Sequence, residues 1–160
     1  MKQQIKLLVN KKQYEIEVEP YWTLAELLRD ELGLLGVKVS CNEGECGACT
    51  ILLDREPICS CMALAVEADG KNIETIEGLS AEGELHPIQQ AFIEYHGMQC
   101  GYCTPGMILS AKALLDKNPN PSEYEVREAI SGNLCRCGAY PKIVKSVLTA
   151  AARMRGDNYE

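Results

Sequence analysis

The stretch Cys41-Asn42-Glu43-Gly44-Glu45-Cys46-Gly47-Ala48-Cys49 carries three cysteines, separated by four and then by two residues. Five further cysteines can complete two groups of four, with one thiol left over. The first group adds either Cys59 or Cys61, and the second consists of Cys100, Cys103, Cys135 and Cys137. Clustered thiols at such short spacings are typical of metal sites. The sequence therefore predicts two separate sites, each built from four thiolates.

The spacing of the first three cysteines favours iron over zinc. It is the spacing of a plant-type [2Fe–2S] ferredoxin, in which one tight loop and one distant thiolate hold both irons. Gly44 and Gly47 lie between the ligands, where the absence of a side chain lets backbone N–H groups turn toward the cluster sulfurs. Zinc held by four thiolates is the alternative for both groups. It competes more strongly for the second group, because a lone C-x2-C pair serves either metal.

The second group of cysteines precedes two expected helices. Cys100 and Cys103 come just before Thr104-Pro105, and Cys135 and Cys137 come just before Pro141. Proline favours the first turn of a helix, and free N–H groups at a helix start stabilise thiolates. Two such starts facing each other would form one site. Tyr102, between two of these cysteines, is expected to serve packing.

Composition limits the class of protein. The 160 residues carry a net charge of −7, which argues against nucleic acid as a partner. No apolar run is long enough to span a membrane, so no membrane insertion is expected. No secretory signal is visible at the start, and nine cysteines are then expected to be reduced thiols in the cytoplasm. If the chain forms two small domains, each hydrophobic core is small, and bound metal clusters would add stability to both.

Hydrophobic patterning predicts an α+β architecture with two domains. Residues 1–77 are expected to form a hairpin (5–9 and 14–18), a helix from the Thr23 capping box to Gly33, and later strands (50–53, 57–61 and 73–76). Residues 78–160 are expected to form four helices that start at Pro87, Thr104, Ser122 and Pro141, with a loose tail from Met154. His86 and His96 are interpreted as capping or surface residues. No catalytic residue is predicted, since no nucleophile–base pair stands out.

Three segments together resemble a known family. They are the loop Cys41–Thr50, the segment Gln99-Cys100-Gly101-Tyr102-Cys103-Thr104-Pro105-Gly106-Met107, and the segment Ser131-Gly132-Asn133-Leu134-Cys135-Arg136-Cys137-Gly138. With them the chain resembles the small iron–sulfur subunit of the molybdenum hydroxylases, the family of xanthine dehydrogenase, aldehyde oxidoreductase and carbon monoxide dehydrogenase. The resemblance runs from about Ile5 to Ala152, nearly the whole chain.

The resemblance implies a β-grasp ferredoxin domain followed by a four-helix bundle, each with a [2Fe–2S] cluster. It selects Cys61 over Cys59, so that the implied ligands are Cys41, Cys46, Cys49 and Cys61, then Cys100, Cys103, Cys135 and Cys137. Gln99 and Cys137 are implied to hydrogen-bond a molybdenum–pterin cofactor on a large partner subunit. A second partner is implied to carry FAD near the ferredoxin-like cluster. Such assemblies are hetero-oligomers, for example dimers of heterotrimers.

Some positions depart from the family pattern. The last ligand is followed by Gly138-Ala139-Tyr140 where Thr-Gly-Tyr is common, Ser40 stands where Gly is usual, and Arg55 replaces a common turn glycine. We therefore predict an electron-transfer subunit, without naming a subfamily or a substrate. The competing hypotheses are a freestanding two-cluster carrier and a zinc-stabilised interaction protein.

Overall fold

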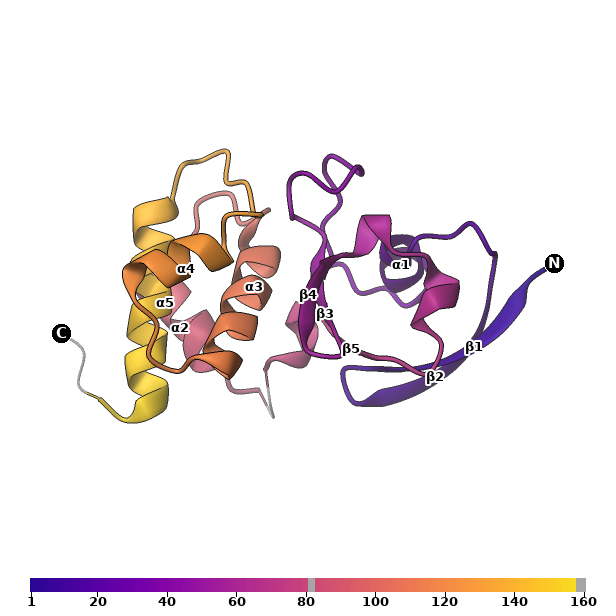
Figure 1. Ribbon diagram of the computed structural model, residues 1–160, viewed down its shortest axis with the longest axis horizontal. Coiled ribbons are helices and arrows are strands. Elements are labelled where there is room, and N and C mark those ends of the chain that lie inside the picture. Colours follow the sequence, from indigo (N-terminus) through magenta and orange to yellow (C-terminus); the bar gives the residue numbers. More distant parts are fainter. Residues whose placement is uncertain (81–82, 158–160) are drawn as a thin grey trace.

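The computed structural model describes residues 1–80 and 83–157, and it separates strands from long helices along the chain (Figure 1). The first half contains five strands and one short helix. These are β1 (Gln3–Val9), β2 (Lys12–Val18), α1 (Leu24–Glu26), β3 (Thr50–Leu53), β4 (Glu56–Cys59) and β5 (Asn72–Glu74). The second half contains α2 (Pro87–Glu94), α3 (Thr104–Lys117), α4 (Glu123–Ala129) and α5 (Tyr140–Arg155). The predicted α+β class is confirmed.

The five strands form one mixed sheet in the order β2-β1-β5-β3-β4. β1 runs parallel to β5, and the remaining pairs are antiparallel. Both hairpins turn through two residues with positive φ, Asn10-Lys11 and Asp54-Arg55. Positive φ at both positions matches the twist of the flanking strands. Arg55 thus adopts the left-handed conformation that glycine would take more easily.

Two predicted strand boundaries are wrong. β4 ends at Cys59, and the chain then enters a 3-10 turn, Ser60–Met62, instead of continuing as strand to Cys61. The turn is fixed by the buried Ser60 hydroxyl, which donates to the Cys49 carbonyl over 2.7 Å. β5 ends at Glu74 rather than Ile76, because Ile76–Gly78 form another 3-10 turn.

The helix that crosses the sheet starts at the predicted capping box. The Thr23 backbone N–H donates to the Glu26 carboxylate at 2.7 Å, and the Glu26 N–H donates to the Thr23 hydroxyl at 3.2 Å. After Glu26 the chain continues as a π-helical turn, Leu27–Glu31, before Gly33 with φ of 69°. Leu24, Leu27 and Leu28 are fully buried in the core of the first half.

The four helices of the second half begin as the sequence predicts. Pro87, Pro105 and Pro141 lie in the first turns of α2, α3 and α5, and the Ser122–Glu125 capping box opens α4. The loose tail predicted from Met154 is wrong at its start, since α5 continues to Arg155 and ends at the left-handed Gly156. Arg153 on this last turn pairs with Glu94 of α2. Residues 158–160 lie outside the described part of the chain.

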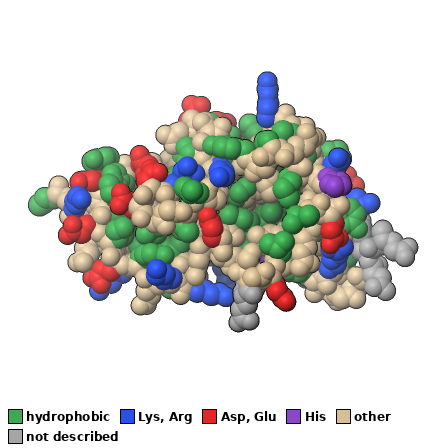
Figure 2. Space-filling view, turned by 180° about the vertical axis from the view of Figure 1, so that it is seen from behind, with side chains coloured by type: hydrophobic (Ala, Val, Ile, Leu, Met, Phe, Trp, Pro, Cys, Tyr) green, Lys and Arg blue, Asp and Glu red, His purple; other side chains and the backbone are tan. Residues whose placement is uncertain are grey.

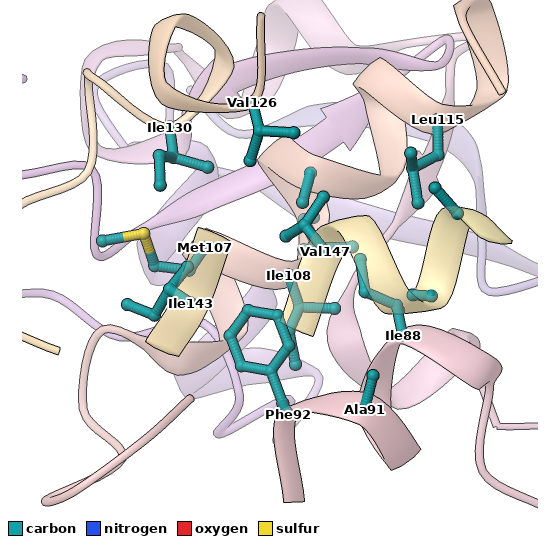
Figure 3. Close-up of a cluster of buried hydrophobic side chains, with 14 of the residues drawn as sticks. Ile88, Ala91, Phe92, Met107, Ile108, Leu115, Val126, Ile130, Ile143 and Val147 are labelled. Carbon is teal, nitrogen blue, oxygen red and sulfur yellow. The ribbon is translucent and has the colours of Figure 1, made fainter. Parts of the chain in front are cut away.

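Side chains from all four helices meet in one apolar core. Ile88 and Phe92 of α2 face Ile108 of α3 and Ile143 and Val147 of α5 (Figure 3). Val126 of α4 and Ile130 just after it close the other side (Figure 3). These side chains are at most 4% exposed, so the helices are held by burial of apolar surface.

The two halves pack directly on each other. α3 lies against β3 and β4, and Leu52 of β3 belongs to the helical core (Figure 1). Ion pairs cross the same boundary, from Lys117 to Glu56 at 2.7 Å and from Lys112 to Glu74 at 3.5 Å. The boundary therefore has an apolar centre with charged contacts at its margin. Across residues 1–80 and 83–157, no helix has the length and apolar character needed to cross a membrane.

Candidate iron–sulfur sites

Three cysteines of the first group, Cys41, Cys46 and Cys49, lie on a loop without regular structure, between the π-helical turn and β3. Positive φ at Asn42, Gly44 and Gly47 coils this loop. The coil turns backbone N–H groups toward Cys41. Hydrogen bonds from the amides of Glu43 and Cys46, the Cys46 thiol and the Glu45 amide lower the pKa of Cys41 to about 7. A thiolate at this position is therefore stabilised by the loop backbone itself.

Cys49, Cys59 and Cys61 lie on the sheet side of the loop. Burial raises the pKa of Cys59 and of Cys61 to about 11 each, and each donates a hydrogen bond to Cys49. Cys59 also donates to the Gly44 carbonyl at 3.7 Å, whereas Cys61 receives a hydrogen bond from the Gly44 amide. Both candidates for the fourth ligand are thus next to the loop. Only Cys61 has a backbone donor of the loop directed at its sulfur.

The second group is assembled from two helix starts, as predicted. Cys103 is the N-cap residue of α3, and Cys135 and Cys137 precede the first turn of α5. Burial raises the pKa of Cys103 to about 12, and its thiol donates a hydrogen bond to Cys135. This contact joins positions that are distant in sequence and places one cysteine of each pair side by side.

Cys135 accepts the hydrogen bond of that contact, and its pKa is lowered whereas that of Cys103 is raised. Burial alone would raise the pKa of Cys135, but amides of Ala139, Cys137 and Gly138 and the Cys103 thiol donate to its sulfur and lower the pKa overall. Its backbone N–H donates to the Tyr140 hydroxyl at 2.8 Å, which holds the segment on α5. The amides that lower the pKa of Cys135 thus belong to the turn just before α5 and to its N-cap residue, Ala139.

Gln99 and Cys137 lie side by side. The Gln99 side-chain amide donates to the Cys137 carbonyl at 3.3 Å, and Gln99 is exposed at the surface. Cys100 is exposed as well, while Cys103 and Cys135 are half-buried. The second site is consequently open on the side of Gln99 and closed on the side of the helical core.

The two cysteine-bearing regions touch each other. The Leu134 amide donates to the Cys46 carbonyl at 2.9 Å, and the Tyr102 hydroxyl donates to the Val39 carbonyl at 2.6 Å. The predicted packing role of Tyr102 therefore includes a hydrogen bond between the two halves. Sequence reasoning missed this contact, and it also missed Asn133, whose buried side chain reaches the first loop. The sequence indicated the roles of Tyr102 and Asn133 only in that both are polar residues close to the second group of cysteines.

The arrangement fits iron–sulfur clusters on three grounds. In each group some thiols are in contact, such as Cys49 with Cys61 and Cys103 with Cys135, and backbone amides of both regions point at sulfur atoms. In addition, the buried Thr104 hydroxyl, directly after Cys103, has no hydrogen-bond partner within the described residues. Such an unpaired group in a native interior indicates a partner outside the protein, and cluster sulfur accepts hydrogen bonds. Among the described residues, no three Cys, His, Asp or Glu side chains gather closely enough to hold a single metal ion.

The two histidines lie away from these contacts. The His86 Nδ1 atom accepts a hydrogen bond from the Ile88 amide at 3.2 Å, so His86 caps α2 as predicted. Burial lowers the pKa of His86, which favours the neutral ring that this cap requires. His96 adopts positive φ at the surface after α2. On the face shown in Figure 2, acidic and basic side chains are interspersed.

Comparison with known proteins defines the class. Residues 7–79 match a family described as a 2Fe-2S iron-sulfur cluster binding domain, and residues 75–148 match one described as a [2Fe-2S] binding domain. The chain is 50% identical to the nicotinate dehydrogenase small FeS subunit of Eubacterium barkeri, over 93% of this chain and 95% of that one. It is 46% identical to the nicotine 6-hydroxylase small subunit of Paenarthrobacter nicotinovorans, over 97% and 93% respectively.

Solved structures agree with this class. A chain of quinoline 2-oxidoreductase from Pseudomonas putida 86 superimposes with a TM-score of 0.91 at 45% identity, over 98% of this chain and 99% of that chain. The aldehyde oxidoreductase of Desulfovibrio gigas superimposes with the same score at 42% identity, over 96% of this chain and 17% of that longer one. The chain belongs to the small [2Fe–2S] subunits of the molybdenum hydroxylase family. The predicted role, an electron-transfer subunit of an oxidoreductase, is confirmed with it.

Proposed function

We propose that the chain holds its two [2Fe–2S] clusters by eight cysteines in two sets. The first set is Cys41, Cys46, Cys49 and Cys61, and the second is Cys100, Cys103, Cys135 and Cys137. The observation that carries this assignment is the set of backbone amides directed at Cys41, Cys61 and Cys135. A bound cluster supplies one-electron transfer, and these amides would offset its negative charge. Gly44 and Gly47 would permit the coiled backbone that presents them.

The two matched regions correspond to two domains in this proposal. Residues 1–77 form a β-grasp ferredoxin domain, whose five-stranded sheet is crossed by α1. The second domain would span residues 78–160, and its described part would form a four-helix bundle from α2 to α5. Two apolar clusters support this division, one within the first half and one of the helices, which Leu52 of β3 joins at the boundary.

We further propose that the chain connects a large molybdenum–pterin subunit with a flavin subunit that carries FAD. Gln99 is exposed and Cys137 is half-buried beside it, so the pair lies where the pterin of a partner can reach it. The ferredoxin-like loop would lie toward the flavin. Relatives named as small or iron–sulfur subunits support such a hetero-oligomer. Nine free cysteines are consistent with placement in the cytoplasm.

The substrate does not follow from this chain. Relatives of 50% and 46% identity are named for nicotinate and for nicotine. Since the pocket for the substrate would lie on the large subunit, similarity of the small subunit is compatible with several substrates.

Iron analysis and EPR test the cluster assignment directly. Protein reduced with dithionite should contain about four irons per chain and give two distinct [2Fe–2S] signals. A colourless protein with zinc would overturn the proposal. Gel filtration of the native material tests the partners. Elution with much larger chains is expected, whereas elution at the mass of the single chain would indicate a freestanding carrier instead.

A further inference from the structure

Asn133 is a buried amide in the turn between α4 and the two cysteines that precede α5. Only 3% of it is exposed. Its Nδ2 group donates to the Gly47 carbonyl at 2.9 Å and to the Thr50 hydroxyl at 3.2 Å. Its Oδ1 atom accepts a hydrogen bond from the Ser110 hydroxyl of α3 at 2.7 Å. Every polar atom of this side chain is thus paired, which is the condition for burying an amide at low cost.

The partners of Asn133 belong to both halves of the molecule. Gly47 lies between two cysteines of the ferredoxin-like loop, and Thr50 begins β3. Ser110 lies on α3, which begins directly after Cys103. Asn133 itself is two residues before Cys135. One carboxamide therefore connects the loop of the first site with both helical segments of the second.

The backbones around this amide approach too closely for any side chain. A Cβ atom on Gly47 would lie 2.2 Å from the Gly132 carbonyl oxygen, and one on Gly106 would lie 2.5 Å from the Gly47 carbonyl oxygen. The adjacent hydrogen bond from Leu134 to the Cys46 carbonyl lies in the same contact. A few close atomic contacts therefore fix how the two regions approach each other. The Asn133 side chain donates the hydrogen bonds at their centre.

We propose that Asn133 is a positioning residue for electron transfer between the clusters, because it fixes the first cysteine loop against the segment that carries Cys135. The proposal rests on the proposed function, in which both cysteine sets hold clusters. An apolar residue of the same size would fill the space without setting the register of the two loops. The buried amide does set it, since displacement of either loop leaves a polar atom unpaired.

The test compares Asn133→Leu with Ser110→Ala in the complete iron-loaded protein. The leucine variant loses both bonds to the first half, whereas the alanine variant loses only the bond within the second half. We expect both proteins to contain about four irons. In the doubly reduced state, Asn133→Leu should change the magnetic interaction between the two cluster signals, and Ser110→Ala should leave that interaction as in the wild type.

Hydrogen exchange provides a second measurement that does not depend on the spectra. Peptides covering residues 42–50 should exchange about tenfold faster in Asn133→Leu, and in Asn133→Asp, than in Ser110→Ala. Equal exchange in all three variants, or an unchanged magnetic interaction in Asn133→Leu, would show that Asn133 serves stability alone. Failure of the proposed function is recognised separately, because wild-type protein would then lack two cluster signals.

Discussion

The two cysteine regions differ in how their thiols are brought together and in how the pKa values of those thiols shift. The ferredoxin-like loop keeps three cysteines within one short segment, and its own amides lower the pKa of Cys41 to about 7. The helical site joins two segments through α3 and α5, and burial raises the pKa of Cys103 to about 12. The first site depends on local backbone conformation. The second depends on a packed helical core that brings its parts together.

This difference predicts how each region responds to substitution. Changes of backbone conformation should damage the loop site most, while the helical site should tolerate them better when its core is intact.

Replacement of Cys61 by Ser should abolish the ferredoxin-like signal and remove about half of the iron, because a four-thiolate cluster loses one ligand. Cys59→Ser is the matched control and should retain both signals, since only Cys61 receives the Gly44 amide. EPR and iron analysis of the two proteins show which of the two thiols is the fourth ligand. The opposite pattern would assign the fourth ligand to Cys59.

Gly47→Ala should destabilise the protein strongly. Its φ of 67° costs a residue with a side chain about 1–2 kcal/mol, and the contact with Gly132 adds overpacking of about 1–3 kcal/mol. Gly101→Ala in the helical site has a similar φ of 81° but no atom within 4 Å of the new Cβ, so only the first cost applies. Thermal unfolding of both variants measures the difference. Equal losses would mean that the close approach of Gly132 adds no cost to a side chain at position 47.

Tyr102→Phe should lower the free energy of unfolding by about 1 kcal/mol, which is the usual net contribution of one hydrogen bond. The hydroxyl lost here donates to Val39 across the boundary of the two halves. Tyr124→Phe is the control, because its hydroxyl contacts only the exposed Glu128 carboxylate on the same helix. Denaturant titration should show a smaller loss for the control. If Tyr124→Phe lowered the free energy of unfolding as much as Tyr102→Phe, the hydrogen bond across the boundary would contribute no more than the exposed one within α4.

The smallest expected effect is the pH dependence of the α4 capping box. Hydrogen bonds from the Ser122 amide, the Ser122 hydroxyl and Asn118 hold the pKa of Glu125 below its ordinary value. Because the folded pKa is the lower one, this stabilisation is complete above the unfolded pKa and is lost as the pH falls through the folded pKa. Glu125→Gln should therefore flatten the dependence of the melting temperature on pH between about pH 6 and about pH 3. An unchanged slope of melting temperature against pH would show that the capping box does not contribute to the pH dependence of stability.

The sequence predicted those features that depend on near neighbours. The first hairpin, both capping boxes, the proline-led helix starts and the loop cysteines each have their signal within a few residues. The contact of Cys103 with Cys135 was predictable because both precede helix starts. Asn133 and Tyr102 could not be assigned in this way, because their partners Gly47 and Val39 come from the other half of the chain. The end of α5 was misjudged for the same reason, since Arg153 pairs with Glu94 of α2.

The order of the sheet leaves β2 as a strand with one unpaired side, whereas β4 at the opposite end is in contact with α3. Open strand edges can pair with the same edge of another molecule and start aggregation. Glu15 and Glu17 stand exposed along β2 and alternate with the partly covered Tyr14 and Ile16, and Lys12 is exposed at the start of the strand. Charged side chains on an edge discourage such pairing. The charged side chains of β2 therefore disfavour pairing of this edge with the same edge of a second chain.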